Sequence, residues 1–208
     1  MSNPKPKGTS LTELHSDPTK AFFVDMLTRD ISLEDAILDL LDNCVDGALR
    51  DSQGTKGKKK FNGYHADIQL SNTRFAITDN CGGIPAENLQ YAFTHGRPPG
   101  QGDVGIATVG IYGIGMKRAI YKLGVEATVA TKCKTLVCEV PFTKSWMSNN
   151  SWKLPLQGTK QHFESDGALL DAIDRLDTIG LACHALEIDH RPSVTDGDAV
   201  RVRTIFFG

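Results

Sequence analysis

Three polar side chains in the stretch ISLEDAILDLLDNCVDGALR, residues 31–50, have the types and the spacing for chemistry assisted by a metal ion. Asp39, Asn43 and Asp46 follow one another at steps of four and three residues, so they share one face of an α-helix. A carboxylate beside an amide oxygen suits the binding of Mg²⁺ together with a water molecule. A solvated acidic face would show the same pattern, and two motifs further along the chain decide between these interpretations.

The other face of this stretch is apolar and would hold the polar side chains against a core. Apolar residues recur at three- and four-residue steps: Leu33, Ile37, Leu40, Leu41, Cys44 and Ala48. This period predicts one amphipathic helix. Ser32 and Asp35 have the spacing of an N-terminal capping box, which fixes the start of the helix.

Two glycine-bearing segments supply what a nucleotide would need. DNCGGIP, residues 79–85, follows the strand-like RFAIT, so Asp79 would end a strand where the glycines permit a sharp turn. VGIYGIGMK, residues 109–117, opens a predicted helix at 116–124, and a helix N-terminus behind a glycine turn binds phosphates. Lys117 and Arg118 lie in its first turn, where a cation opposes the helix dipole unless an anion is near.

The remaining patterns predict a mixture of helices and strands. Alternating residues predict β-hairpins at 66–78 and 125–140 and an edge strand at 199–207. Helical spacing predicts helices at 19–29, with Phe22, Phe23, Met26 and Leu27 packed, at 86–93 and at 166–182. The glycine-rich segment 94–112 is predicted to be a mobile flap.

Composition limits the class of protein. The 208 residues suffice for one large domain, and we expect a flexible arm at 1–18, a domain at 19–160 and an extension of unknown role at 161–208. The net charge of −2 gives no general attraction to nucleic acid or lipid, and no apolar run reaches the length of a membrane span. Five cysteines without a tight framework, and an N-terminus without an apolar core, favour cytoplasmic residence.

Two common nucleotide motifs do not fit. A Walker A loop needs GxxxxGK followed by Ser or Thr, whereas here Met116 intrudes before Lys117 and Arg118 replaces the hydroxyl residue. A Rossmann fingerprint needs GxGxxG early in a βαβ unit, whereas the order here is GxxGxG, in mid-chain, between predicted hairpins.

The order of the three motifs, DxxxNxxD on a helix, DNxGGIP at a strand end and GxxGxGxK opening a helix, resembles the Bergerat-fold (GHKL) ATPases. That class includes gyrase B subunits, MutL, MORC proteins, histidine kinases and the large heat-shock chaperones. The resemblance covers residues 20–140; VGIYGIGMKRAIYKLG looks most like the MORC version, and residues 18–48 resemble uncharacterised bacterial ATP-binding proteins. It implies an α+β fold: a two-layer sandwich of a mixed, largely antiparallel sheet with helices on one face.

The resemblance also implies ATP and Mg²⁺ as cofactors and assigns roles to residues. Asn43 would bind Mg²⁺, Asp39 would activate the attacking water, and Asp79 would accept a hydrogen bond from the adenine amino group. Other positions implied to line the nucleotide are Asp46, Gly83, Ile84, Gly110, Gly113, Ile114, Gly115, Met116, Lys117 and, by a poorer match, Thr159.

Two positions depart from the family pattern. Asp39 stands where gyrase-like members have glutamate, and its shorter side chain must still come within hydrogen-bond reach of a water. Cys81 stands where the family usually has a glycine, so the turn there must keep a negative φ.

The expected function is therefore Mg²⁺-dependent ATP binding with slow hydrolysis, in which a glycine-rich lid closes over the nucleotide and changes conformation or dimerisation. One alternative is a protein-histidine kinase catalytic domain, although no helix with an H-[DE] phosphoacceptor precedes the motifs. Another is an ATP-binding module that does not hydrolyse. Family analogy suggests a homodimer on ATP binding and a DNA or protein partner, with no membrane.

Overall fold

The computed structural model describes residues 16–53, 61–71, 73–96, 108–110, 113–134, 136–173 and 200–205. Its helices are α1 (Lys20–Thr28), α2 (Leu33–Asp51), α3 (Ala86–Phe93), α4 (Gly115–Leu123) and α5 (Lys144–Ser148). Its strands are β1 (His65–Leu70), β2 (Arg74–Asp79), β3 (Glu126–Cys133), β4 (Leu136–Phe142), β5 (Gly167–Ile173) and β6 (Val200–Ile205). The predicted arm and flap lie largely outside the described residues.

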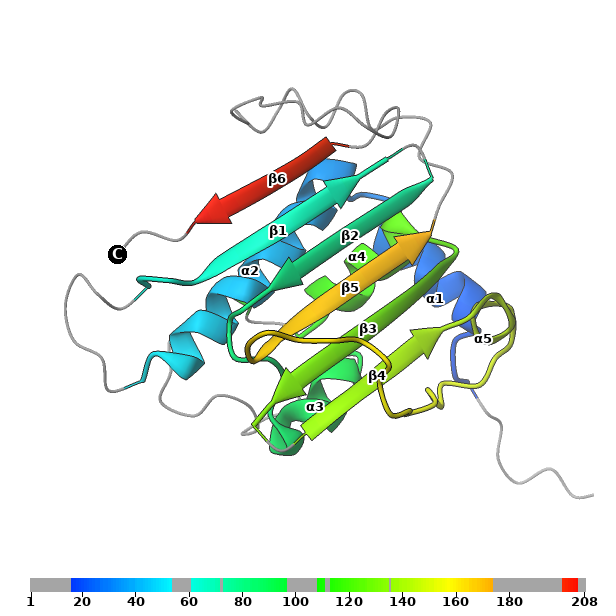
Figure 1. Ribbon diagram of the computed structural model, residues 1–208. Helices are drawn as coiled ribbons and strands as arrows, with labels where there is room; N and C mark the ends of the chain where they lie inside the picture. The colour runs from blue at the N-terminus through cyan, green and yellow to red at the C-terminus, as the bar shows by residue number, and fades with distance from the viewer. Residues whose placement is uncertain are drawn as a thin grey trace, which may run out of the picture.

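The strands form one six-stranded sheet in the order β4-β3-β5-β2-β1-β6. Every pair of neighbouring strands is antiparallel. Figure 1 shows α1, α2, α3 and α4 together behind this sheet, so the fold has two layers, with helices on one face. The prediction of an α+β sandwich is confirmed. Among the described residues, no helix combines the length and the apolar character needed to cross a membrane.

Helix α2 begins and packs as its sequence predicts. The Ser32 side chain accepts a hydrogen bond from the Asp35 N–H, and the Asp35 carboxylate accepts one from the Ser32 N–H, which completes the capping box. Ile37, Leu40 and Cys44 on the predicted apolar stripe are buried in the core beneath the sheet. The helix is thereby fixed in rotation, and Asp39 on its polar face contacts Arg118 of α4.

Residues 167–173 do not form the helix that the leucine spacing of 166–182 predicts. Residues 167–173 form β5, which lies between β3 and β2 in the centre of the sheet, while 174–182 lie outside the described residues. Leu170 and Ala172 are buried and Leu169 and Asp171 less so, which is the alternation of a strand. Small residues and leucines fit the period of a helix as well as that of a strand. Pairing with β2 on one edge and β3 on the other selects the strand. A domain boundary at 160 would leave out this central strand.

Helix α1 forms as predicted but packs through fewer residues. Phe22 and Met26 are exposed, whereas Phe23 contacts His95 and Trp152 edge to face. Beside them Lys20 is buried, with its ammonium group 3.5 Å from the centre of the Trp146 ring and 2.5 Å from the Trp146 carbonyl oxygen. Trp146 and Trp152 therefore anchor the 143–153 segment against α1.

Candidate nucleotide-binding site

A cavity of about 340 Å³ opens between α2, the turn after β2 and the N-terminus of α4. Twelve of the thirteen residues implied by the family resemblance line it: Asp39, Asn43, Asp46, Asp79, Gly83, Ile84, Gly110, Gly113, Ile114, Gly115, Met116 and Lys117. Motifs that are 70 residues apart in the sequence, such as Asn43 and Gly113, thus meet at one place. Thr159 does not line the cavity, and its hydroxyl donates to Glu139 instead.

Asp79 ends β2 and lines the cavity. Its Oδ1 accepts hydrogen bonds from the N–H groups of Cys81 (2.8 Å) and Ala168 (3.2 Å). Among the described residues, its Oδ2 accepts a hydrogen bond from the Cys44 thiol alone, at 3.5 Å, and a thiol is a weak donor. Burial raises the pKa of this carboxyl group, and the two backbone donors offset part of that rise. Oδ2 is therefore an acceptor available to a ligand with an N–H group.

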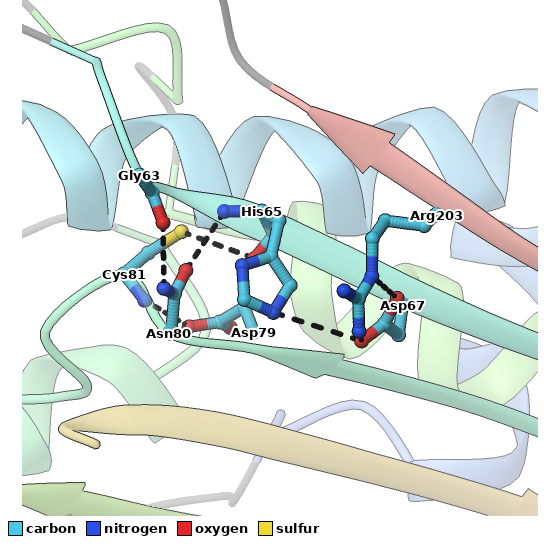
Figure 2. Close-up of polar contacts among 7 residues, drawn as sticks. All are labelled: Gly63, His65, Asp67, Asp79, Asn80, Cys81 and Arg203. Carbon is cyan, nitrogen blue, oxygen red and sulfur yellow. Dashed lines mark hydrogen bonds and ion pairs between the residues drawn. The ribbon is translucent and has the colours of Figure 1, made fainter. Parts of the chain in front are cut away.

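The turn after Asp79 is tied to the start of β1. Figure 2 shows Asn80 between two backbone groups: its Oδ1 accepts from the His65 N–H at 2.7 Å, and its Nδ2 donates to the Gly63 carbonyl at 2.8 Å. Lys134 is the one non-glycine with positive φ among the described residues, so Cys81 keeps the negative φ that its side chain requires. The turn that follows Asp79 is thus held in place by the two Asn80 hydrogen bonds.

Gly83 is required by its contact with β3. Its φ is +66°, and a Cβ built there would lie 2.1 Å from the Lys132 carbonyl oxygen. Its neighbour Ile84 donates its N–H to the Thr131 hydroxyl at 2.9 Å, which pins the turn against the sheet. The close approach of Gly83 to β3, in addition to its place at the cavity, therefore explains why position 83 requires a residue without a side chain.

We expect Gly83→Ala to destabilise the protein by roughly 2–4 kcal/mol. Alanine is strained at the left-handed φ of this position, and the clash of its Cβ with β3 adds to that strain. Gly63→Ala is the matched control, since Gly63 also has a positive φ (+92°) but nothing within 4 Å of its Cβ position. Urea unfolding of both variants measures the difference. A similar loss of stability in the two variants would contradict the role of the Lys132 contact.

Asp39 lies at the N-terminus of α4 and is bound there by Arg118. The guanidinium group donates from Nε to Oδ2 (2.9 Å) and from Nη2 to both Oδ1 (2.9 Å) and Oδ2 (2.7 Å). The pair is partly shielded, with side chains 33% and 18% exposed. A cation in the first turn of α4, unfavourable by itself, is thus explained by a carboxylate from α2.

Asn43 lies one turn beyond Asp39, exposed to the cavity. Its Nδ2 donates to the Asp39 carbonyl oxygen at 2.6 Å, which leaves its Oδ1 as the available ligand atom. Within the described residues, no group of three or more His, Cys, Asp or Glu side chains could hold a metal ion. A single amide oxygen fits Mg²⁺, which in nucleotide sites takes one or two protein ligands and completes its octahedron with phosphates and water.

Asp46 binds the described residues near the end of the glycine-rich segment 94–112, and Lys117 binds the residues that flank this segment. The buried Asp46 carboxylate accepts from the N–H groups of Val109 (2.6 Å) and Gly110 (3.0 Å). The Lys117 ammonium donates to the carbonyl oxygens of Ala92, at the end of α3, and Gly113. Both side chains therefore fix backbone at the rim of the cavity.

Sequence reasoning missed several residues of the cavity. Cys44 bonds Asp79, Ala168 supplies a backbone donor from β5, and Asp42 lies on α2 between the two carboxylates at 39 and 46. Burial raises the pKa of Asp42, with further increases from Asp39 and Asp46. Ala168 could not be found because its segment reads as a helix.

The fold and the cavity together define an ATPase domain of the Bergerat type: an antiparallel sheet, a long helix with Asp and Asn facing the cavity, and a glycine turn opening a further helix. Residues 31–175 match the family of histidine kinase-, DNA gyrase B- and HSP90-like ATPases. The match spans more than half of the chain, and the protein belongs to this family. Family membership supports ATP binding. No curated protein matches the sequence.

Proposed function

We propose that this domain binds Mg²⁺·ATP in the cavity between α2 and α4 and hydrolyses it slowly. The observation that carries the proposal is the meeting of three features around one cavity: a strand-end carboxylate, an amide on α2 and the N-terminus of α4. They match, in order, the adenine, the metal and the phosphates of one nucleotide.

Adenine recognition rests on Asp79. Its Oδ2 would accept the hydrogen bond of the adenine 6-amino group, while Oδ1 remains bound to the backbone. Guanine presents a carbonyl oxygen at that position, and two acceptors facing each other in a buried site repel and leave both unpaired. Asp79 should therefore select adenine over guanine.

Phosphate binding rests on α4. Its N-cap residue Ile114 makes no side-chain cap hydrogen bond to the first turn of the helix. The N–H groups of this turn and the helix dipole favour an anion at this place. Mg²⁺ held by Asn43, when bound, would neutralise part of the phosphate charge.

Hydrolysis rests on Asp39. A water beside the γ-phosphate would give a proton to this carboxylate while the water oxygen forms a bond to the γ-phosphorus. The bond from the γ-phosphorus to the bridging oxygen would break, leaving ADP and inorganic phosphate. The short side chain and the ion pair with Arg118 both favour a slow reaction.

The segment 94–112 is included in the proposal as a lid, because Asp46 binds Val109 and Gly110 within it and Lys117 binds the flanking residues Ala92 and Gly113 at the cavity rim. Pairing of two copies on ATP binding belongs to the same proposal and is supported by family analogy.

A thermal-shift titration with Mg²⁺·ATP and Mg²⁺·GTP tests the proposal. At ATP concentrations about 100-fold above Kd, the melting temperature should rise by roughly 5–10 °C, because ligand binding stabilises the folded state. GTP should give little or no shift. Equal shifts with the two nucleotides would contradict adenine selection by Asp79, and no shift with either would contradict the function.

A further inference from the structure

The carboxylate of Asp39 occupies the place where the proposed site would bind phosphate. A Cβ built on Gly115, the first residue of α4, would lie 3.3 Å from both Cγ and Oδ1 of Asp39. The carboxylate therefore lies directly against the helix N-terminus, where the dipole favours negative charge. This anion site already contains a carboxylate from the chain itself.

Arg118 makes the contact specific. Three charge-assisted hydrogen bonds of 2.7–2.9 Å join its guanidinium group to the two carboxylate oxygens. A guanidinium fork fits a carboxylate and a phosphate with the same planar, two-point geometry, and Arg cannot lose its charge. A phosphate group at the same helix end would therefore compete with Asp39 for the same donors.

We propose that Arg118 recognises the γ-phosphate of the nucleotide by leaving Asp39, so that the fork is a self-inhibitory contact released by a nucleoside triphosphate. This inference rests on the proposed function. A diphosphate lacks the group that competes with the carboxylate, so Arg118 stays on Asp39 when ADP is bound. Departure of Arg118 also frees the carboxylate oxygens of Asp39, so the water-activating group becomes available when the γ-phosphate is present.

The exchange predicts opposite effects of removing its two partners. Arg118→Gln removes the γ-phosphate contact and should weaken binding of a non-hydrolysable ATP analogue by about tenfold or more, since hydrogen bonds to charged groups are among the strongest. Asp39→Asn removes the competing charge and should strengthen binding of the analogue several-fold. Neither substitution should change ADP affinity by more than about twofold, because ADP does not use the fork.

The test is calorimetric titration of the full chain with the analogue and with ADP, both with Mg²⁺, for wild type, the two single variants and the double variant. The gain from Asp39→Asn should disappear in the double variant, because the released guanidinium is its source. Arg203→Gln is the matched control. Arg203 donates from Nε and Nη2 to the two carboxylate oxygens of Asp67, at 2.6 and 2.7 Å, on the sheet (Figure 2), and neither residue lines the cavity. It should bind both nucleotides as wild type does.

Equal weakening of ATP-analogue and ADP binding by Arg118→Gln would overturn the inference, since a purely structural ion pair does not distinguish the two. An unchanged analogue affinity in Asp39→Asn would also overturn it. Arg118→Lys, which keeps the charge and loses the fork, should lie between wild type and Arg118→Gln. If wild type bound neither nucleotide, both the inference and the proposed function would fail. If wild type bound both, but Arg118→Gln kept the wild-type ratio of ATP-analogue affinity to ADP affinity, the inference alone would fail.

Discussion

Asp39→Asn is expected to reduce ATP hydrolysis by roughly 100- to 10,000-fold, the range that general-base catalysis contributes. An amide cannot take the proton of the attacking water, but it has the shape of the carboxylate and should leave the cavity intact. The variant should still bind ATP, because Asp79, Asn43 and the N-terminus of α4 are unchanged. Release of labelled phosphate from γ-labelled ATP, at saturating nucleotide, measures the loss.

Asp42 provides the rival base and the sharpest comparison. It lines the same cavity on the same helix, and burial together with Asp39 and Asp46 raises the pKa of its carboxyl group, which increases its basicity. If Asp42→Asn stopped phosphate release while Asp39→Asn did not, the catalytic role would move to Asp42. The same labelled ATP also separates the alternatives: label on the protein would indicate a kinase, and intact bound ATP a module that does not hydrolyse.

Asn43→Ala should abolish Mg²⁺-dependent ATP binding at concentrations that saturate wild type. The substitution removes the oxygen available to the metal and also the hydrogen bond to the Asp39 carbonyl. Without the ion, the triphosphate would enter a cavity lined by Asp39, Asp42 and Asp46 with much of its charge uncompensated. Calorimetric titration with ATP, in Mg²⁺ and again in a chelator, measures the dependence.

Asn43→Asp is the control for this prediction. It keeps an oxygen at the same place and should retain Mg²⁺-dependent binding, since carboxylates are good ligands for this ion. Wild-type affinity for Mg²⁺·ATP in Asn43→Ala, with the same response to chelation, would show that the metal ligand lies elsewhere.

Local patterns were sufficient to predict much of the fold. The capping box of Ser32 and Asp35, the apolar stripe of α2 and the two hairpins depend on residues close together in the chain, and all are confirmed. The prediction of a helix was wrong for residues 167–173, because the β5 strand there depends on pairing with two distant strands, β2 and β3, rather than on its own residue spacing. The exposure of Phe22 and Met26 likewise depends on what α1 packs against.

The candidate site was predictable in its members more than in its contacts. Motif order grouped Asp39, Asn43 and Asp79, which line one cavity, but it could not show that Arg118 binds Asp39 or that Lys117 binds both Ala92 and Gly113. A cation in the first turn of a helix signalled that an anion must be near. The sequence left open whether that anion belongs to a ligand or, as here, to the chain.

The central position of β5 has a consequence for the order in which the protein folds. The β1–β2 and β3–β4 hairpins are local and can pair early, but their facing edges stay open until residues 167–173 emerge from the ribosome. Open strand edges pair readily with other chains. Synthesis therefore passes through a stage at which two half-sheets, each with an unprotected edge, await one late strand, and chaperone protection would matter most in that interval.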